Sequence, residues 1–209
     1  MSIYYQGWIY RFLDTKNQPQ EIQDYLRREN ELLLQNIEQN TSAVDFGCGC
    51  GRHLELLGTN LRYGLGFDIV GQYIKIGTER LKKYPNLKLM VSDARNAGLH
   101  NNKFDYSICM NNTLGNIEEQ GKVVSEMRRV ILPNGLILAG VYSEKSIDSR
   151  IGWYERTGLT IEKVTKDQII TQQGFKSEHF SRSKLSTLFG NCSIEDIAGI
   201  GYLAISAKT

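Results

Sequence analysis

The sequence has no long apolar segment and few of the residues that build metal or disulfide sites. Its 209 residues include only four cysteines, three histidines and three prolines. No apolar run approaches the roughly 18 residues that a membrane-spanning helix requires. The N-terminal segment is aromatic but has no basic stretch followed by an apolar core, so it lacks the form of a secretory signal. We therefore expect a cytoplasmic protein with no membrane association.

The cysteine spacing fits neither a disulfide framework nor a zinc site. Two cysteines lie in a glycine-rich turn, one in a predicted strand and one near a late strand (Cys48, Cys50, Cys109 and Cys192). The three histidines (His53, His100 and His179) do not add ligands at the spacing that zinc requires. We expect reduced cysteines and no bound metal.

The charges are nearly balanced and scattered along the chain. There are 25 basic and 23 acidic residues, which give a net charge of +2. A dedicated nucleic-acid binder is expected to concentrate Lys and Arg in a patch or stripe. The composition therefore favours a small-molecule ligand over nucleic acid.

After residue 40, short apolar runs alternate with helical patterns, which predicts an α/β fold with a parallel sheet covered on both faces. Strands are expected at 43–46, 62–67, 87–91, 104–109 and 136–142, and helices at 51–58, 71–83 and 118–131. The turn-forming residues 132–135 separate the last of these helices from its strand. An amphipathic helix is predicted to precede the sheet, from Pro19 to about Ile37.

The last third of the chain has a different pattern. Two β-like runs within 159–171 flank Lys166-Asp167 and predict a hairpin, and Ser181 is a suitable N-cap for a following helix. The runs 194–198 and 202–207 are separated only by Gly199-Ile200-Gly201. So short a connection can join antiparallel strands but cannot form a parallel crossover.

The most informative segment is 44–51, where an acid and three alternating glycines follow an apolar strand. Asp45, Gly47, Gly49 and Gly51 form a D-x-G-x-G-x-G pattern. Glycines at this spacing remove side chains from a strand-to-helix turn, so a ligand can lie on the backbone amides at the helix N-terminus. A nicotinamide dinucleotide fingerprint would need a glycine where Arg52 stands.

Two further acids follow the next two predicted strands. Asp68 ends the second strand, and Asp93, followed by Ala94, ends the third. In open α/β sheets, ligands bind at the carboxyl ends of the strands. A carboxylate there can accept hydrogen bonds from both hydroxyls of a ribose, so the three acids together predict a nucleoside-bearing ligand.

The glycine-rich segment resembles motif I of the class I S-adenosylmethionine-dependent methyltransferases. The resemblance implies a Rossmann-like, seven-stranded and mostly parallel sheet with an antiparallel last strand, helices on both faces and an N-terminal helical cap. It implies one domain over 1–209, in which 1–40 is the cap and 41–142 the cofactor-binding half. Residues 143–180 would be an insertion on the substrate side, and 181–209 the closing helix and strands.

The resemblance also implies S-adenosylmethionine as the cofactor, with S-adenosylhomocysteine as product. Asp68 would bind the ribose, and Asp93 the exocyclic amine of adenine. Arg28 is our candidate for the cofactor carboxylate, with Arg27 and Arg52 as alternatives, because a guanidinium binds a carboxylate bidentately. The full predicted set is Asp45, Gly47, Cys48, Gly49, Gly51, Asp68, Ile69, Asp93, Ala94, Met110 and Arg28.

The loop after the fourth strand occupies the position that faces the reacting methyl group in this family. It contains Asn111 and Asn112 but none of the prolines that mark enzymes methylating amines of nucleic-acid bases. Cys109 follows Ile108 inside the strand and is expected in the core. The loop is similar to that of glycine N-methyltransferase relatives. We predict that Asn111 and Asn112 orient the acceptor, with His179 as the one candidate base.

Aromatic residues are expected to form the walls of the acceptor site, and the predicted set is Tyr5, Trp8, Tyr142, Trp153 and Tyr154. We expect N-methylation of a small-molecule amine by a monomer or homodimer, because methyl transfer to a neutral amine depends mainly on positioning. The alternatives are O-methylation of a small metabolite, methylation of RNA or of a protein or peptide, and a non-catalytic cofactor-binding protein.

Overall fold

The structure of the protein is a computed structural model that describes residues 11, 12 and 14–208. Among these residues, no helix combines the length and the apolar composition needed to cross a lipid bilayer. The four cysteines are free, and three of them are buried.

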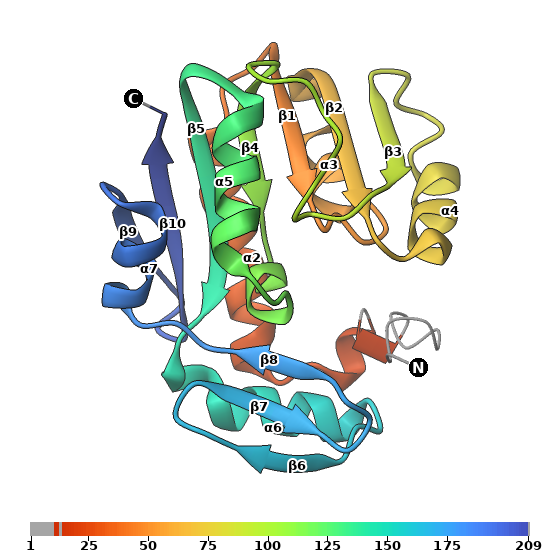
Figure 1. Cartoon of the computed structure of the whole chain (residues 1–209). Helices are drawn as coiled ribbons and strands as arrows, with labels where there is room; N and C mark the ends of the chain where they lie inside the picture. Colours follow the sequence, from red (N-terminus) through yellow and green to blue (C-terminus); the bar gives the residue numbers. More distant parts are fainter. Residues whose placement is uncertain (1–10, 13, 209) are drawn as a thin grey trace.

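A seven-stranded sheet forms the centre of the molecule (Figure 1). Its strands are β1 (Thr41–Phe46), β2 (Leu61–Asp68), β3 (Leu87–Val91), β4 (Phe104–Cys109), β5 (Ile131–Tyr142), β9 (Ser193–Ile197) and β10 (Gly201–Ala207). They lie in the order β3-β2-β1-β4-β5-β10-β9. The five strands from β3 to β5 are parallel, and β10 runs antiparallel to both β5 and β9. The predicted Rossmann-like fold is therefore confirmed.

Six described α-helices and four short 3-10 turns accompany the sheet. The helices are α2 (Gln20–Asn36), α3 (Arg52–Leu57), α4 (Gly71–Arg80), α5 (Gln120–Val130), α6 (Ile147–Arg156) and α7 (Arg182–Phe189), and the 3-10 turns are η2 (Thr15–Asn17), η3 (Gly58–Asn60), η4 (Thr113–Asn116) and η5 (Glu144–Ser146). A second sheet contains β6 (Ile161–Val164), β7 (Gln168–Thr171) and β8 (Lys176–Glu178).

Alternating side chains of the central strands supply two separate cores. In β1, Ala43 faces a cluster with residues of α2 and α3, whereas Val44 and Phe46 face a cluster with residues of α5 and α7. Successive side chains of a strand point to opposite faces, so a strand buried on both sides is apolar along its whole length. Helices therefore cover both faces of the sheet, as the fold prediction required.

The helix α2 packs on one face of the sheet instead of lying over its edge. Its buried positions include Ile22, Tyr25, Leu32 and Leu33, which recur at helical spacing and face the core. Glu29 falls on the same buried face and is fully inaccessible to solvent. The predicted helix is therefore present, and its Glu29 reaches the loop after β4, where it contacts the Asn111 N–H.

The second sheet and α6 form a layer beyond the carboxyl ends of the parallel strands (Figure 1). The predicted hairpin is present as β6 and β7, joined around Lys166-Asp167. The helix α6 and the strand β8 were not predicted. Arg150 interrupts the apolar pattern of α6, yet its guanidinium is fully buried and donates a hydrogen bond to the Ser177 carbonyl of β8.

The strand β5 begins earlier than predicted. Residues 132–135, expected as a turn, lie within β5, but the pairing with β4 is irregular there. Phe104 pairs with Ile131 and Tyr106 with Leu136, so the chain advances by two residues in β4 and by five in β5 between these pairs. The turn-forming sequence therefore produces an irregularity within the strand instead of a boundary.

Close packing of α4 against the glycine-rich turn gives a first prediction. A Cβ at Gly77 would lie 2.9 Å from the backbone of Cys50 and would collide with Leu89. Gly77→Ala should therefore destabilise the protein by about 1–3 kcal/mol, the usual cost of overpacking. Urea unfolding measures the change in the free energy of unfolding.

The matched control is Gly121→Ala in α5, where no atom lies within 4 Å of the added Cβ. Alanine has the higher helix propensity, so this variant should be neutral or gain up to about 1 kcal/mol. Equal stability changes in the two variants would contradict the packing explanation.

Candidate functional site

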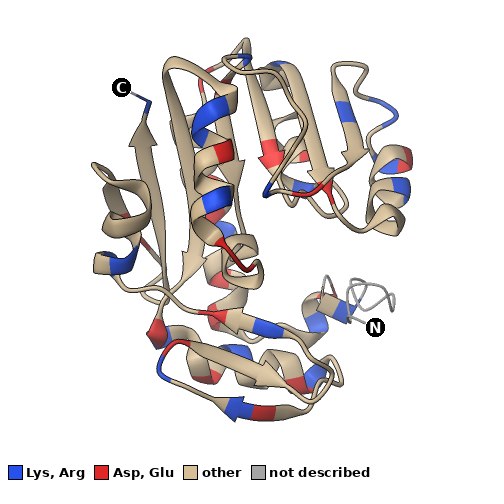
Figure 2. Ribbon diagram, in the orientation of Figure 1, with Lys and Arg blue, Asp and Glu red and all other residues tan. Residues whose placement is uncertain are grey.

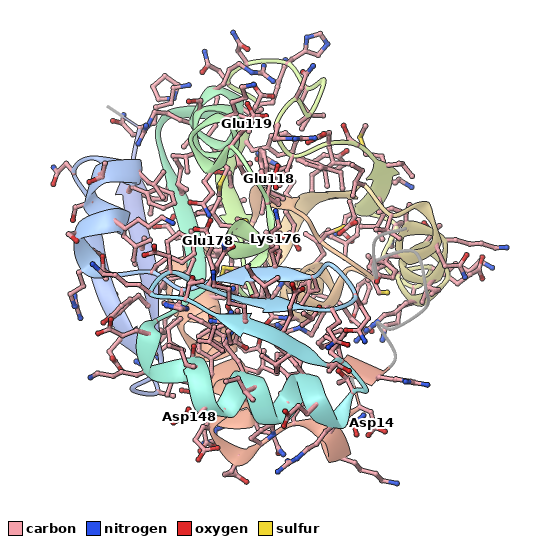
Figure 3. The ribbon with its side chains drawn as sticks, turned by 60° about the horizontal axis from the view of Figure 1, so that its bottom comes forward. Asp14, Glu118, Glu119, Asp148, Lys176 and Glu178 are labelled. Atoms are coloured by element: carbon pink, nitrogen blue, oxygen red, sulfur yellow. The ribbon has the colours of Figure 1, made fainter. Side chains whose placement is uncertain are left out.

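A cavity of about 870 Å³ lies at the carboxyl ends of the parallel strands, between the central sheet and the layer formed by α6 and β8. The glycine-rich turn, the ends of β2 and β3 and the loop after β4 contribute to one wall, and α6 and β8 to the other. On the rim, Lys176 of β8 pairs with Glu118 from the loop before α5 at 3.3 Å, and Glu178 lies close by (Figure 3). The two layers thus enclose the site.

The glycine-rich turn exposes backbone to this cavity. Gly47, Gly49 and Gly51 have φ values of 70°, 53° and 77°, which only glycine adopts readily. Gly47, Cys48 and Gly49 line the cavity. Gly51 instead caps α3 and packs against Leu81. The turn presents a wall without bulky side chains, which suits a ligand that rests on the peptide groups.

Asp68 and Ile69 line the cavity at the end of β2. The Asp68 carboxylate accepts hydrogen bonds from the Gly49 N–H at 3.0 Å and from the Val70 N–H at 2.9 Å. Burial raises the pKa of Asp68. Ile69 is 51% exposed and offers an apolar surface beside the carboxylate. The second strand therefore supplies both an acceptor and an apolar contact.

Asp93 and Ala94 line the cavity after β3. The Arg95 guanidinium forms a bidentate ion pair with the Asp93 carboxylate, in which Nη2 lies 2.6 Å from Oδ2. The backbone N–H of Arg95 also donates a hydrogen bond of 2.8 Å to Asp93 Oδ1. The hydrogen bonds from the Arg95 side chain lower the pKa of Asp93. The acid is ionised, and the local turn orients it.

A cluster of buried ionisable groups lies beneath the glycine-rich turn. Glu29 Oε2 is 3.3 Å from Nη2 of Arg52 and 3.3 Å from Nε2 of His53. His53 Nδ1 lies 3.9 Å from Asp45 Oδ2, a buried oxygen without a hydrogen-bond partner. Burial and then the charge of Arg52 lower the pKa of His53, whereas burial, only partly offset by Arg52, raises the pKa of Asp45 to about 8. At neutral pH, Asp45 therefore holds its proton and His53 is uncharged.

The loop after β4 contributes Met110, Asn111 and Asn112 to the cavity. Asn112 is buried, and its amide is fully engaged: Nδ2 donates to Ser177 Oγ and the Glu178 carbonyl, and Oδ1 accepts from the Tyr142 N–H. Asn111 is more accessible, and the Tyr142 hydroxyl lies 3.4 Å from its Oδ1. Of the two predicted asparagines, Asn111 is thus the one free to contact a ligand.

Aromatic side chains form the wall opposite the glycine-rich turn. Three of the residues predicted for the acceptor site, Tyr142, Trp153 and Tyr154, line the cavity, and Phe12 and Phe175 also line it. The Phe12 ring packs edge-on against Trp153 at 5.3 Å. Two other predicted wall residues, Tyr5 and Trp8, lie outside the described residues. This half of the cavity suits an apolar or planar ligand.

The structure does not bring Arg28 or His179 into the cavity. Arg28 lies on the exposed side of α2 and pairs with Glu31 at 3.1 Å. His179 is buried, and its Nε2 lies 2.6 Å from the Lys166 carbonyl in the hairpin turn. His179 thus packs the hairpin onto β8.

The ionisable cluster at the site consists of Glu29, Arg52 and His53 together with Asp45, and the first three were not in the predicted set. Arg52, one of the three arginines considered for the cofactor carboxylate, lines the cavity. His53 also lines it, at the start of α3. The helical spacing of Glu29 could have identified it as buried, because it follows Tyr25 by four residues on the apolar stripe of α2. Among the described residues, no group of His, Cys, Asp and Glu is arranged to hold a metal ion.

Comparison with known proteins agrees with this geometry. Residues 43–135 match a family model described as a methyltransferase domain. The chain is 24% identical over 115 residues to a demethylmenaquinone methyltransferase of Staphylococcus epidermidis, covering 53% of this chain and 47% of that protein. A related enzyme of Staphylococcus aureus is 27% identical over 114 residues. The chain spans about half the length of the curated relatives it matches.

Solved structures extend the likeness beyond the matched segment. The PH0226 protein of Pyrococcus horikoshii has a TM-score of 0.73 at 21% identity, covering 96% of this chain and 99% of that one. A 1,6-didemethyltoxoflavin N1-methyltransferase of Burkholderia thailandensis, with S-adenosylhomocysteine bound, has a TM-score of 0.65 at 14% identity and covers 88% and 78%. At these identities the likeness establishes the fold.

Residues 43–135 thus match a methyltransferase domain, and the chain shares its fold with a solved methyltransferase that binds S-adenosylhomocysteine. The predicted resemblance to S-adenosylmethionine-dependent methyltransferases is confirmed at the level of the fold and of the matched domain. The roles of individual site residues remain predictions.

The buried Asp45 gives a prediction for stability against pH. Its pKa in the folded protein is about 8, above the ordinary value of 3.8, so between these values the folded state binds a proton that the unfolded state has released. Stability therefore falls as pH rises through this window. Asp45→Asn cannot titrate, so the variant should gain stability over the native protein between pH 5 and pH 8, by at most about 1.4 kcal/mol per pH unit.

Urea unfolding of both proteins at several pH values in this window measures the difference. Parallel stability curves for the two proteins would show that Asp45 is ionised in the folded state.

Proposed function

We propose that this protein transfers the methyl group of S-adenosylmethionine to a small-molecule acceptor, at an amine nitrogen. The observation that carries the proposal is the single cavity in which the glycine-rich turn, Asp68 and Asp93 face an aromatic wall across Asn111. The glycine-rich turn and the two acids suit a nucleoside with an amino-acid tail, and the aromatic wall suits a small acceptor. When bound, the cofactor supplies a methyl group on a sulfonium, which is a strong electrophile.

The size and the charge of the site favour a small acceptor. The cavity lies between two layers, and the Lys176–Glu118 ion pair spans its rim. Lys, Arg, Asp and Glu are interspersed over the elements that surround it (Figure 2). A nucleic-acid substrate would favour a continuous basic surface. Enclosure and mixed charge therefore support a small molecule over RNA.

The ionisable groups of the site favour nitrogen over oxygen as the acceptor atom. A hydroxyl acceptor needs a base to take its proton, whereas a neutral amine attacks through its lone pair and releases its proton afterwards. His53 is the only histidine lining the cavity within the described part of the chain. Its Nε2 lies 2.7 Å from the Arg52 guanidinium and 3.3 Å from Glu29 Oε2, so this nitrogen already has partners within the protein. Transfer would then depend on positioning, which can supply about 7–11 kcal/mol of a barrier.

We further propose that Arg52 binds the carboxylate of the cofactor. Arg52 extends from the start of α3, directly after the glycine-rich turn, and lines the cavity. A guanidinium there can meet a carboxylate bidentately. Arg28 pairs with Glu31 on α2 and does not line the cavity.

This assignment predicts a ligand-specific loss of affinity. Arg52→Gln should weaken binding of S-adenosylhomocysteine by about tenfold or more, the cost of a lost charged hydrogen bond. Binding of 5′-methylthioadenosine, which lacks the amino-acid tail, should stay nearly constant. Titration calorimetry with both ligands measures the effect, and Arg28→Gln is the matched control. An equal loss for both ligands would remove Arg52 from this role.

A second acceptor class is favoured by one specific observation. Five aromatic side chains line the acceptor side of the cavity (Phe12, Tyr142, Trp153, Tyr154 and Phe175). The curated relatives named demethylmenaquinone methyltransferase carry the name of a quinone acceptor. A planar ring could stack in the same space, so the alternative is methylation of a ring compound at an atom other than an amine nitrogen.

The test of the proposed function uses S-adenosylmethionine with a deuterated methyl group. The purified protein is incubated with extract of the native host, and small molecules, RNA and protein are separated before mass spectrometry. Label on an amine in the small-molecule fraction is the expected result. Label on a quinone or a hydroxyl would support the alternative acceptors. Label confined to RNA or protein would overturn the proposal, and cofactor binding without any label would indicate a non-catalytic protein.

A further inference from the structure

The loop that faces the acceptor has an unusual backbone conformation. Asn111 and Asn112 are consecutive residues with φ values of 52° and 56°, in the left-handed region. Asparagine tolerates this region better than most residues, but two in succession need support from their surroundings. Asn112 is held by its own side chain, which bridges to β5 and β8. Asn111 needs a different support.

Glu29 provides that support from α2. Its Oε1 accepts a hydrogen bond of 2.6 Å from the Asn111 N–H and one of 3.0 Å from the Tyr25 hydroxyl. The Glu29 side chain has no exposed surface, so it stands behind the loop and does not touch a ligand in the cavity. A carboxylate on one helix thus fixes the peptide group of the residue that faces the ligand.

The neighbouring strand leaves room for this carboxylate. Gly140 of β5 has no side chain, and a Cβ there would collide with Oε1 of Glu29. The carboxylate is also held in its charged form. Burial raises the pKa of Glu29, but the contacts with His53 and Arg52 and the Asn111 hydrogen bond outweigh it, and the pKa lies below its ordinary value.

Asn111 stands where two cavities meet. A second cavity of about 560 Å³, between the N-terminal segment and α2, shares Phe12, Arg52, Asn111 and Trp153 with the larger one. Within the larger cavity, Asn111 lies together with the glycine-rich turn and the aromatic wall, so a shift of its peptide would change the geometry between the proposed cofactor side and the proposed acceptor side. Small errors at such a boundary have large effects on an in-line transfer.

We propose that Glu29 is a positioning residue for methyl transfer, which holds the Asn111 peptide in its left-handed conformation and so sets the geometry between the methyl group and the acceptor. This inference rests on the proposed function. It assigns Glu29 no contact with either ligand.

Glutamine and alanine at position 29 separate this role from the charge of Glu29. Glutamine has nearly the same shape, and its one oxygen can keep the bonds with Asn111 and Tyr25 while its amide nitrogen replaces the oxygen that faces Arg52. Alanine removes the support for Asn111 altogether. Gly140→Ala tests the same contact from the strand, because the added methyl group displaces Oε1. Glu31→Ala, at an exposed acid of the same helix, is the matched control.

The measurement is the rate of deuterated-methyl transfer into the acceptor fraction of the native-host extract, at saturating S-adenosylmethionine, so that changes in cofactor affinity do not contribute. Glu29→Ala and Gly140→Ala should each slow transfer by about tenfold or more, the effect of losing one hydrogen bond to a charged group. Glu29→Gln and Glu31→Ala should stay within about threefold of the native rate on the same scale. Binding of 5′-methylthioadenosine should be retained in all four variants.

The outcomes separate the inference from the proposed function. Native protein that transfers label, with Glu29→Ala and Gly140→Ala equally active, would overturn the positioning role alone. Glu29→Gln as slow as Glu29→Ala would overturn it too, because the charge and not the Asn111 hydrogen bond would then be required. Parallel loss of rate and of 5′-methylthioadenosine binding would show a purely structural role. Absence of transfer by the native protein would overturn the proposed function and the inference with it.

Discussion

The ligand site depends on the parallel alignment of β1, β2, β3 and β4. Because these strands run in one direction, their carboxyl ends lie along one edge of the sheet, and the segments after them all face the same space. The glycine-rich turn, Asp68, Asp93 and the Asn111 loop come from segments far apart in the sequence. They line one cavity only because four strand ends coincide. The antiparallel β10 ends this arrangement on one side.

Beneath that edge, the fold tolerates a group of buried ionisable side chains. Burying a charge is costly unless it is paired, and the Glu29 carboxylate meets Arg52, the Tyr25 hydroxyl and a backbone N–H. Asp45 has no such partner for one oxygen and holds its proton instead. The cluster joins α2, β1, α3 and the loop after β4, so the floor of the cavity is held by polar contacts as well as by apolar packing.

The layer of α6 and the small sheet completes the site from the other side. Arg150 is fully buried between the rings of Tyr142 and Tyr154 and binds the Ser177 carbonyl. Asn112 reaches the same strand from the loop after β4. The aromatic wall is thus fixed to the loop after β4, and this half of the cavity is as well defined as the half that contains the glycine-rich turn.

The strand ends and the residues directly after them could be located without any tertiary information. Apolar runs identify buried strands, and the glycines and acids that come after such runs belong at the carboxyl edge of the sheet, so Asp68 and Asp93 were predictable. The choice between Arg28 and Arg52 as the residue facing the cavity required the folded structure, as did the position of His179 outside it. The positions of these side chains depend on how a helix is rotated against the sheet and on the path of the segment between β5 and α7. Glu29 became recognisable only once α2 was packed, because a local pattern does not reveal which distant backbone group a buried carboxylate meets.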